Sequence, residues 1–225
     1  MARRTPLSRE RILATALRLA DESGIESLTM RKLAAALGVE AMSLYNHVAN
    51  KGDLVDGIVD LVVDEIELPD GDVDWRAAMR ACAMSAYEAF LRHPWAGSLA
   101  IGPTSTRQPR TPRLRYMEWL LQRLREAGFS PELAYHAYHA LDAHILGFTL
   151  WQLGHSAAAS AAADGLGLAD LAARFIPELR AAGYPHLAQH VEQHLEANDD
   201  AGEFAFSLEL ILDGLERAQV QQAPS

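Results

Sequence analysis

Apolar residues recur along this chain at spacings of three and four positions, the period that places side chains on one face of an α-helix. We find no stretch with the alternation of apolar and polar residues that indicates a β-strand. Glycine and proline separate the periodic segments, as they do between helices. The pattern therefore predicts an all-α fold.

Four helices are expected in the N-terminal part. Ser8 and Thr29 are good N-caps, and Gly24 and Gly38 stand where glycine ends a helix without steric cost. Asn50, with an acidic residue three positions later, resembles a capping box that opens the fourth helix. The predicted helices are 9–23, 30–37, about 41–48 and about 51–66.

The remainder of the chain shows further helical segments. Loops are expected at 103–112, which is rich in proline and threonine, and at 154–168, which has low sequence complexity. Pro177 is expected to interrupt its helix. The predicted segments are 75–93, 95–101, 111–128, 131–153, 169–182, 185–197 and 203–219.

The distribution of charge changes what the total charge suggests. The formal net charge is −10, which by itself argues against nucleic-acid binding. Residues 1–51, however, carry eight Lys and Arg against five Asp and Glu, a balance of +3 that leaves −13 on residues 52–225. We therefore expect the N-terminal segment to face DNA while the acidic remainder is repelled.

Cysteine content and hydropathy exclude several protein classes. Cys82 is the only cysteine, which excludes an intramolecular disulfide and a cysteine-rich zinc site. No run of eighteen apolar residues occurs, and the basic N-terminus lacks the apolar core of a signal peptide. We expect a soluble cytoplasmic protein without a membrane span.

Residues 28–54 have the layout of a helix-turn-helix DNA-binding motif. Ala34 is small where two helices would cross, Gly38 suits the turn, and Leu44 would anchor the second helix. The outward face of that helix would meet bases and phosphates, and the next helix would begin at a phosphate. The candidates are Ala41, Met42, Ser43, Tyr45, His47 and Lys51. Similar turns occur in helical proteins that do not bind DNA, so spacing alone leaves both interpretations open.

These residues resemble the DNA-binding domain of the TetR (tetracycline repressor) family of bacterial transcription regulators. The resemblance is strong over 8–66 and looser at 75–217, where it is similar to the tetracycline-repressor branch. The matching positions of the motif are 28–34, 37–40, 43–45, 47–48, 50–51 and 54. It implies a three-helix head at 1–52, a connecting helix at about 51–66, and a helical ligand-binding and dimerisation domain at 67–225.

The resemblance also implies partners. Members of the family are homodimers that bind palindromic double-stranded operator DNA and respond to a small-molecule effector. Tetracycline repressors have Gln and Pro where this chain has Ala41 and Met42, so a different base preference is expected. The positions that match the family's DNA contacts are Arg31, Ala41, Met42, Ser43, Tyr45 and Lys51. We expect a regulator, most simply a repressor that an effector releases from its operator.

A ligand cavity is expected among the C-terminal helices. Their inner faces are apolar, with Met117 and Leu120 among them. The helix 131–153 adds polar residues at three- and four-residue spacings, which we interpret as one face. These residues are Tyr135, Tyr138, His139 and Asp142. For the last three, ligand contact and purely structural hydrogen bonding fit the pattern equally well.

The family resemblance adds four positions to the cavity. Tetracycline-responsive members carry Asn, Phe, His and Thr where this chain has Cys82, Ala86, Ala100 and Pro103. Alanine and proline cannot ligate a metal, so we expect no magnesium–drug chelate and no other cofactor. The effector is expected to be a different, mostly apolar molecule.

The histidines keep an alternative open, an all-helical metal-dependent enzyme that uses His and Asp residues on helices. Histidines four positions apart can bind a metal. We prefer a solvated polar face, because Gln189 and Gln193 lie beside the histidines of one helix. An enzyme is disfavoured because the HExxH and GxSxG motifs and a phosphate-binding loop are lacking. A third possibility is a DNA-binding module that responds to a protein partner. The residues concerned are His136, His139, Asp142 and His144 on one helix and His186, His190 and His194 on another.

Dimerisation is expected to use the last helix and the end of the long helix. Two such helices from each subunit would form a four-helix bundle. The apolar residues expected there are Phe148, Leu150, Trp151, Phe204, Leu208, Ile211, Leu212 and Leu215. The alternative is that the last helix packs only within its own chain.

Overall fold

A computed structural model describes residues 6–71, 73–100, 111–162, 168–196 and 200–222, and within these residues every regular element is a helix. The all-α prediction is therefore confirmed. None of the described helices has the length and apolar character needed to cross a membrane. The elements are α1 (Arg9–Ser23), η1 (Ile25–Ser27), α2 (Met30–Leu37), α3 (Ala41–Leu44), α4 (Lys51–Asp64), α5 (Trp75–Arg92), α6 (Gly97–Ala100), α7 (Pro112–Glu126), α8 (Pro131–Ala162), α9 (Leu168–Ala181), α10 (Pro185–Glu196) and α11 (Asp200–Gln222).

The helices near the N-terminus begin and end at the residues that the sequence indicates. The side chains of Ser8, Thr29 and Asn50 accept hydrogen bonds from backbone N–H groups in the first turns of α1, α2 and α4. Gly24 and Gly38 have φ of 78° and 68°, a region that side chains with a Cβ rarely adopt. The predicted caps are thus confirmed.

Three segments differ from the prediction. The α-helical part of α3 ends at Leu44 rather than near residue 48, and backbone N–H groups of His47 and Val48 bond the Leu44 carbonyl. The long helix α8 continues to Ala162. Its end is rich in alanine, which is the residue type with the highest helix propensity. Pro177 lies inside α9 without ending it. The predicted loop 103–112 lies outside the described residues up to position 110.

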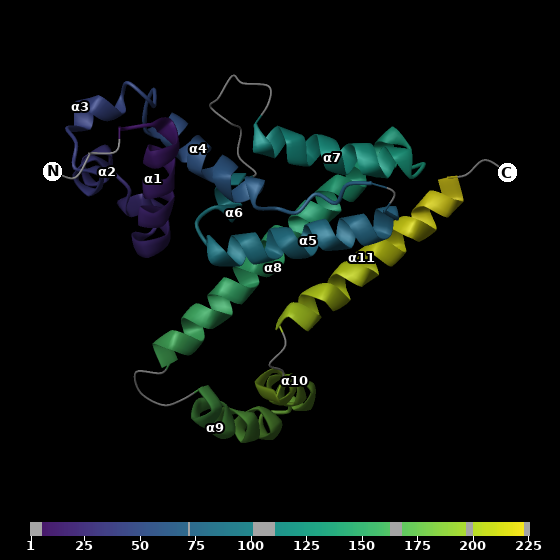
Figure 1. Cartoon of the computed structure of the whole chain (residues 1–225). Helices are drawn as coiled ribbons and strands as arrows, with labels where there is room; N and C mark the ends of the chain where they lie inside the picture. The colour runs from purple at the N-terminus through teal and green to yellow at the C-terminus, as the bar shows by residue number, and fades with distance from the viewer. Residues whose placement is uncertain (1–5, 72, 101–110, 163–167, 197–199, 223–225) are drawn as a thin grey trace.

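The helices form two parts joined by α4 (Figure 1). We call residues 6–50, which contain α1–α3, the N-terminal head, and α5–α11 the body. In the body α5 packs on α8 and α11, while α7 packs on both α4 and α8. The pair α9 and α10 lies at one end of the body and has a small apolar core of its own.

One buried apolar cluster runs from the head through α4 into the body. Leu44 belongs to the head, Ile58 to α4 and Leu120 to the body, and each is at most 2% exposed. The head is also fastened by polar contacts. The ring of His93, which caps α5, has Nδ1 2.8 Å from Asp21 on α1 and Nε2 3.2 Å from Glu65 after α4. A movement of α4 would therefore change contacts in both the head and the body.

The apolar residues of α11 divide between two faces. Four residues expected at a dimer interface are instead buried within the chain, because α11 packs on α8 and α5. The prediction is wrong for these four, which are Phe204, Leu208, Leu212 and Leu215. Another stripe of α11 is free within the chain, with Phe206 68% and Leu210 57% exposed. On α8, Leu150 and Trp151 are exposed as expected.

Candidate DNA-binding surface and ligand cavity

Helices α2 and α3 meet in a tight turn. Gly38 is left-handed, with φ 68° and ψ 38°, and its N–H bonds carbonyls at the end of α2. The Val39 N–H bonds the Ala34 carbonyl at 3.0 Å, and Ala34 itself is 3% exposed. Leu44 is completely buried below α3. This is the geometry of a helix-turn-helix motif.

The opposite face of α3 points to solvent at the far side of the head from the body (Figure 1). Met42 is 75% exposed and Tyr45 is 45% exposed, although both are large and partly or wholly apolar. Arg31 and Lys51 are exposed beside α3, at the starts of α2 and α4, and Ala41, Ser43 and His47 are half-buried. Exposed apolar side chains flanked by cations suit contact with base edges and phosphates.

Arg9 holds this surface in place from α1. Its guanidinium donates to the His47 carbonyl at 3.1 Å and to both carboxylate oxygens of Asp53 at 3.0 and 2.8 Å. The hydrogen bond from Arg9 is the main reason that the pKa of Asp53 is lowered. Asp53 also accepts from the Ala49 N–H, so this carboxylate of α4 joins Arg9 of α1 to the end of the α3–α4 connection.

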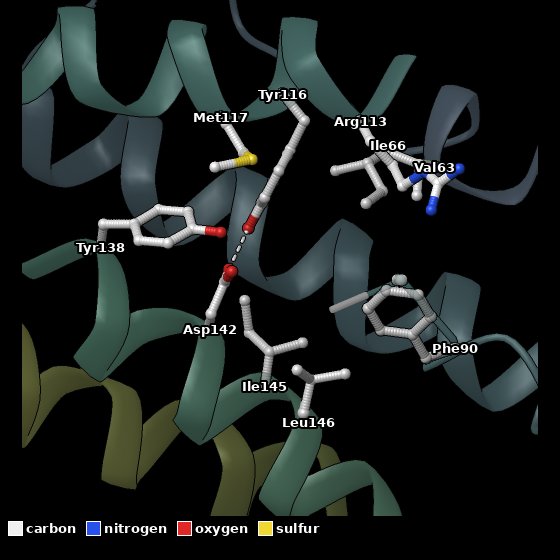
Figure 2. A pocket seen from close by; sticks show the side chains of 11 residues that line it. Val63, Ile66, Phe90, Arg113, Tyr116, Met117, Tyr138, Asp142, Ile145 and Leu146 are labelled. Atoms are coloured by element: carbon white, nitrogen blue, oxygen red, sulfur yellow. Dashed lines mark hydrogen bonds between the residues drawn. The ribbon is translucent and has the colours of Figure 1, made fainter. Parts of the chain in front are cut away.

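A small cavity lies where α4, α5, α6, α7 and α8 meet (Figure 2). Its volume is about 40 Å³, enough for a few water molecules but far below the roughly 300 Å³ of a small ligand pocket. A larger ligand can therefore enter only if these helices move apart. The lining residues are Val63, Ile66, Phe90, Ala100, Arg113, Tyr116, Met117, Tyr138, Asp142, Ile145 and Leu146.

One side of the cavity carries a carboxylate and two phenols. The Tyr116 hydroxyl donates to Asp142 Oδ1 at 2.8 Å, and the Tyr138 hydroxyl also hydrogen-bonds to this carboxylate. Burial raises the pKa of Asp142 above its ordinary value, although both hydrogen bonds act in the other direction. Burial likewise raises the pKa values of Tyr116 and Tyr138, so both hydroxyls stay protonated and can donate.

The other side carries a buried cation (Figure 2). Arg113 is 5% exposed, and its Nη2 and Nε atoms donate to Asp56 at 3.0 Å and to Asp60 at 2.9 Å. Burial raises the pKa of Asp60, the Arg113 contact lowers it, and the nearby Asp56 charge raises it further. Both aspartates belong to α4, so the cavity wall and the connecting helix share this guanidinium.

Four of the ten expected ligand-binding residues line the cavity: Ala100, Met117, Tyr138 and Asp142. Cys82, Ala86 and Leu120 are at most 2% exposed but lie in the core beside it, where burial raises the pKa of the Cys82 thiol. Pro103 lies outside the described residues.

The prediction that four residues of α8 line the cavity is wrong for two of them. Tyr135 is 58% exposed, and His139 is exposed and lies against it, with Nδ1 2.9 Å from the Tyr135 carbonyl. All four lie within about 100° of the helix circumference, so helix geometry alone does not separate them. Packing does, because Tyr138 and Asp142 line the cavity with Tyr116 of α7.

Sequence reasoning missed the polar groups that couple the cavity to α4. Two features of the sequence could have pointed to them. Asp56 and Asp60 interrupt the apolar pattern of a helix at a spacing of four, and Arg113 stands in a first helical turn, where a cation is unfavourable. Neither feature identifies its partner, since the pairs are 57 and 53 positions apart in the chain.

The histidines do not form a metal site within the part of the chain that the structure describes, where no three His, Cys, Asp or Glu residues are placed to hold an ion. His144 instead stacks on Phe204 at a centroid distance of 4.8 Å, and burial lowers its pKa. His155 and His194 face each other at a ring distance of 5.1 Å between α8 and α10.

Comparison with protein families matches both parts of the molecule. Residues 12–58 match the model of "Bacterial regulatory proteins, tetR family". Residues 68–219 match "Tetracyclin repressor-like, C-terminal domain". The first match ends within α4, and the second begins shortly after that helix.

Two curated relatives cover nearly the whole chain. It is 34% identical over 222 residues to the HTH-type transcriptional repressor DrrR1 of Streptomyces coeruleorubidus, covering 93% of this chain and 77% of that protein. It is 31% identical over 213 residues to the class D tetracycline repressor protein of Escherichia coli, covering 93% of this chain and 89% of that protein.

The fold is also similar to that of ActR, a TetR family protein from Streptomyces coelicolor. Apo ActR gives a TM-score of 0.77 at 27% identity, over 97% of this chain and 99% of that chain. ActR in complex with actinorhodin gives a TM-score of 0.72 at 26% identity, over 96% and 99%.

Proposed function

Because this chain belongs to the TetR family of DNA-binding, ligand-responsive transcription regulators, we propose that it represses transcription as a homodimer on a palindromic operator. A small, mostly apolar effector then releases it. The observation that carries this proposal is the exposed face of α3. Large side chains lie on this face beside exposed cations, while Leu44 on the opposite face is completely buried.

Each proposed contact has a physical role. Met42 and Ala41 offer methyl groups to thymine, and Ser43, Tyr45 and His47 offer hydrogen bonds to bases or phosphates. Arg31 and Lys51 neutralise phosphates on either side. In a two-fold dimer the two α3 helices would enter major grooves about 34–36 Å apart.

The dimer would form on the exposed apolar stripe that α8 and α11 share. Leu150, Trp151, Phe206 and Leu210 are between 38% and 68% exposed in the single chain. Large apolar side chains gathered on neighbouring helices are typical of a surface that a partner covers. A two-fold axis through this stripe would produce the symmetry that a palindrome requires.

The cavity is the proposed effector site. Ala100 stands in its wall where tetracycline-responsive members carry a histidine, so no metal ligand is supplied there. The lining is mainly apolar and aromatic, and ActR, which has a similar fold, was solved with actinorhodin. We propose an aromatic effector whose entry widens the cavity and shifts α4, which carries Val63 into the wall and leads to the head.

The proposal is tested by selecting bound fragments from random double-stranded DNA and measuring the affinity of the selected site. Tyr45→Ala should weaken binding by about ten-fold or more, since a lost base or phosphate contact costs about 1–3 kcal/mol. Tyr135→Ala is the matched control, because Tyr135 is also an exposed tyrosine, at 58% against 45% for Tyr45, but lies on α8. Equal affinity of the two variants at matched salt would show that α3 is not the reading helix.

The salt dependence gives a second measurement. Each Lys51 that binds a phosphate contributes about 0.9 to the slope of log affinity against log salt, so Lys51→Ala in a dimer should reduce the slope by about 1.8. An unchanged slope would remove Lys51 from the contact surface. A purified chain that stays monomeric and binds no duplex would contradict the proposed function altogether.

A further inference from the structure

Arg113 lies at the junction between the cavity and the connecting helix. Its side chain is 6% exposed, it lines the cavity, and it bridges Asp56 and Asp60, whose side chains are 12% and 14% exposed. The two hydrogen bonds use two of the five N–H groups of a guanidinium. The same group is therefore placed to meet a molecule in the cavity.

The charges in this group are unfavourable for the helices that carry them, α7 and α4, when each helix is considered alone. A cation in the first turn of α7 opposes the helix dipole. Asp56 and Asp60 are like charges four positions apart on α4, an arrangement that destabilises a helix. The guanidinium of Arg113 contacts both carboxylates and so offsets part of their repulsion. Removing the guanidinium would break both of these contacts between α7 and α4.

The rest of the cavity defines the molecule that would fit. Apolar side chains, among them Phe90 and Ile145, line the wall between Arg113 on one side and the Asp142 carboxylate on the other (Figure 2). Because the cavity is only about 40 Å³, a flat ring compound fits between these sides once the helices move apart. Asp142, already bonded by Tyr116, accepts hydrogen bonds, whereas the guanidinium donates them. The two sides thus favour opposite groups on the ligand.

Resting on the function proposed above, we propose that the effector is an aromatic acid and that Arg113 exchanges its α4 aspartates for the acidic group of that effector. A planar guanidinium matches a carboxylate with two parallel hydrogen bonds, which are strong in a closed cavity. The two hydrogen bonds that join α7 to Asp56 and Asp60 on α4 are then broken. The exchange favours a state with a displaced α4, and the head moves with it.

The test uses three matched pairs of probes: benzoic, 2-naphthoic and anthracene-2-carboxylic acid, each with its methyl ester. Binding to the full chain is measured by calorimetry. For the ring size that binds best, the acid should bind about ten-fold more tightly than the ester, because the ester offers no anion to Arg113. Arg113→Gln should abolish this preference, so that the acid and its ester bind with equal affinity.

Two further variants distinguish ligand binding by Arg113 from misfolding and from a purely structural role of this residue. Asp56→Asn with Asp60→Asn keeps two hydrogen-bond acceptors but removes the competing charges. The acid should then bind several-fold more tightly and yet lose most of its effect on operator affinity. If Arg113→Gln does not fold, the triple variant, in which all three groups are neutral amides, replaces it.

Arg115→Gln is the matched control, because Arg115 pairs with Asp64 on α4 from the exposed side of α7, outside the cavity. This variant should keep the preference for the acid. The inference is overturned if no pair shows an acid preference, whether through equal binding or no binding, or if Arg113→Gln retains it. Esters that release operator DNA as well as acids do would overturn the inference and leave the proposed function intact. A chain that binds no duplex but prefers acids would contradict the function alone.

Discussion

The N-terminal head and the cavity of the body differ in whether their candidate functional residues are exposed or buried. In the head the candidate contact residues lie outside, as Met42 at 75% exposure shows, and a buried apolar core supports them. In the cavity the polar groups lie inside, with Arg113 at 5% exposure, and their partners come from other helices. The candidate contact residues of the head are thus open to solvent, whereas the polar groups of the cavity are shielded from it.

This difference predicts where each region is vulnerable. Exposed polar contacts contribute little to folding, so substitutions on the face of α3 should change binding more than stability. Buried ion pairs are different, because removing one partner leaves an uncompensated charge in the interior. In the cavity, function and stability should therefore change together.

The largest effect is expected from Arg113→Gln. Asp56 and Asp60 would lose their contacts with a buried guanidinium, which should lower the free energy of unfolding by about 3–5 kcal/mol. Urea denaturation followed by circular dichroism measures this loss. Arg115→Gln, which breaks an exposed pair between the same helices, should cost about 0–1 kcal/mol. Equal losses would show that burial does not set the strength of this contact.

A comparable contrast is expected inside the head. Leu44→Ala removes a completely buried side chain and should lower the free energy of unfolding by about 2–5 kcal/mol. Met42→Ala, two positions away on the exposed face, should stay within about 0.5 kcal/mol of the parent. Hydrogen exchange of the α1–α3 amides locates the loss. Stability changes of similar size in both variants would mean that α3 does not divide into an anchored and a free face.

The smallest expected effect is a difference between the two regions in how their carboxylates make stability depend on pH. The pKa of Asp53 is lowered from 3.8 by Arg9, so its contribution to stability is present above 3.8 and is lost as the pH falls through the lower folded value. Asp142 has the opposite shift, since its pKa is raised by burial. Its ionisation therefore reduces stability as the pH rises from 3.8 through the raised value.

Thermal unfolding across this pH range tests both signs. Asp53→Asn should destabilise the chain near neutral pH and have little effect in acid. Asp142→Asn should show its largest relative stabilisation towards neutral pH, diminished there by weaker hydrogen bonds from Tyr116. Parallel pH profiles of the two variants would contradict the assignment of one carboxylate to a paired surface site and the other to a buried one.

The local elements of the head were predictable because their causes lie within a few residues. The caps at Ser8, Thr29 and Asn50 and the left-handed turn at Gly38 each depend on neighbours in the chain. The end of α3 and the extension of α8 were less predictable, since helix ends depend on small differences in backbone hydrogen bonding.

The cavity was predictable only in part. Apolar periodicity predicted Met117 in the cavity wall, where it lies although it is 36% exposed, and the wall also contains Tyr138 and Asp142. The same pattern predicted Tyr135 and His139 there, but both are exposed outside the cavity. In α11 the apolar pattern could not separate residues that pack on α8 from those left exposed, such as Phe206. Periodicity shows that a residue is apolar, but not which neighbour covers it.

The amino-acid sequence by itself determined the all-α fold, the caps and turn of the helix-turn-helix, the basic N-terminal segment and the family, because each of these is written in short-range spacing and local charge. Only the tertiary structure decided which polar groups meet inside the body. Arg113 reaches Asp56 and Asp60 across more than fifty positions of the chain, and only the packing of α7 on α4 brings them within 3.0 Å.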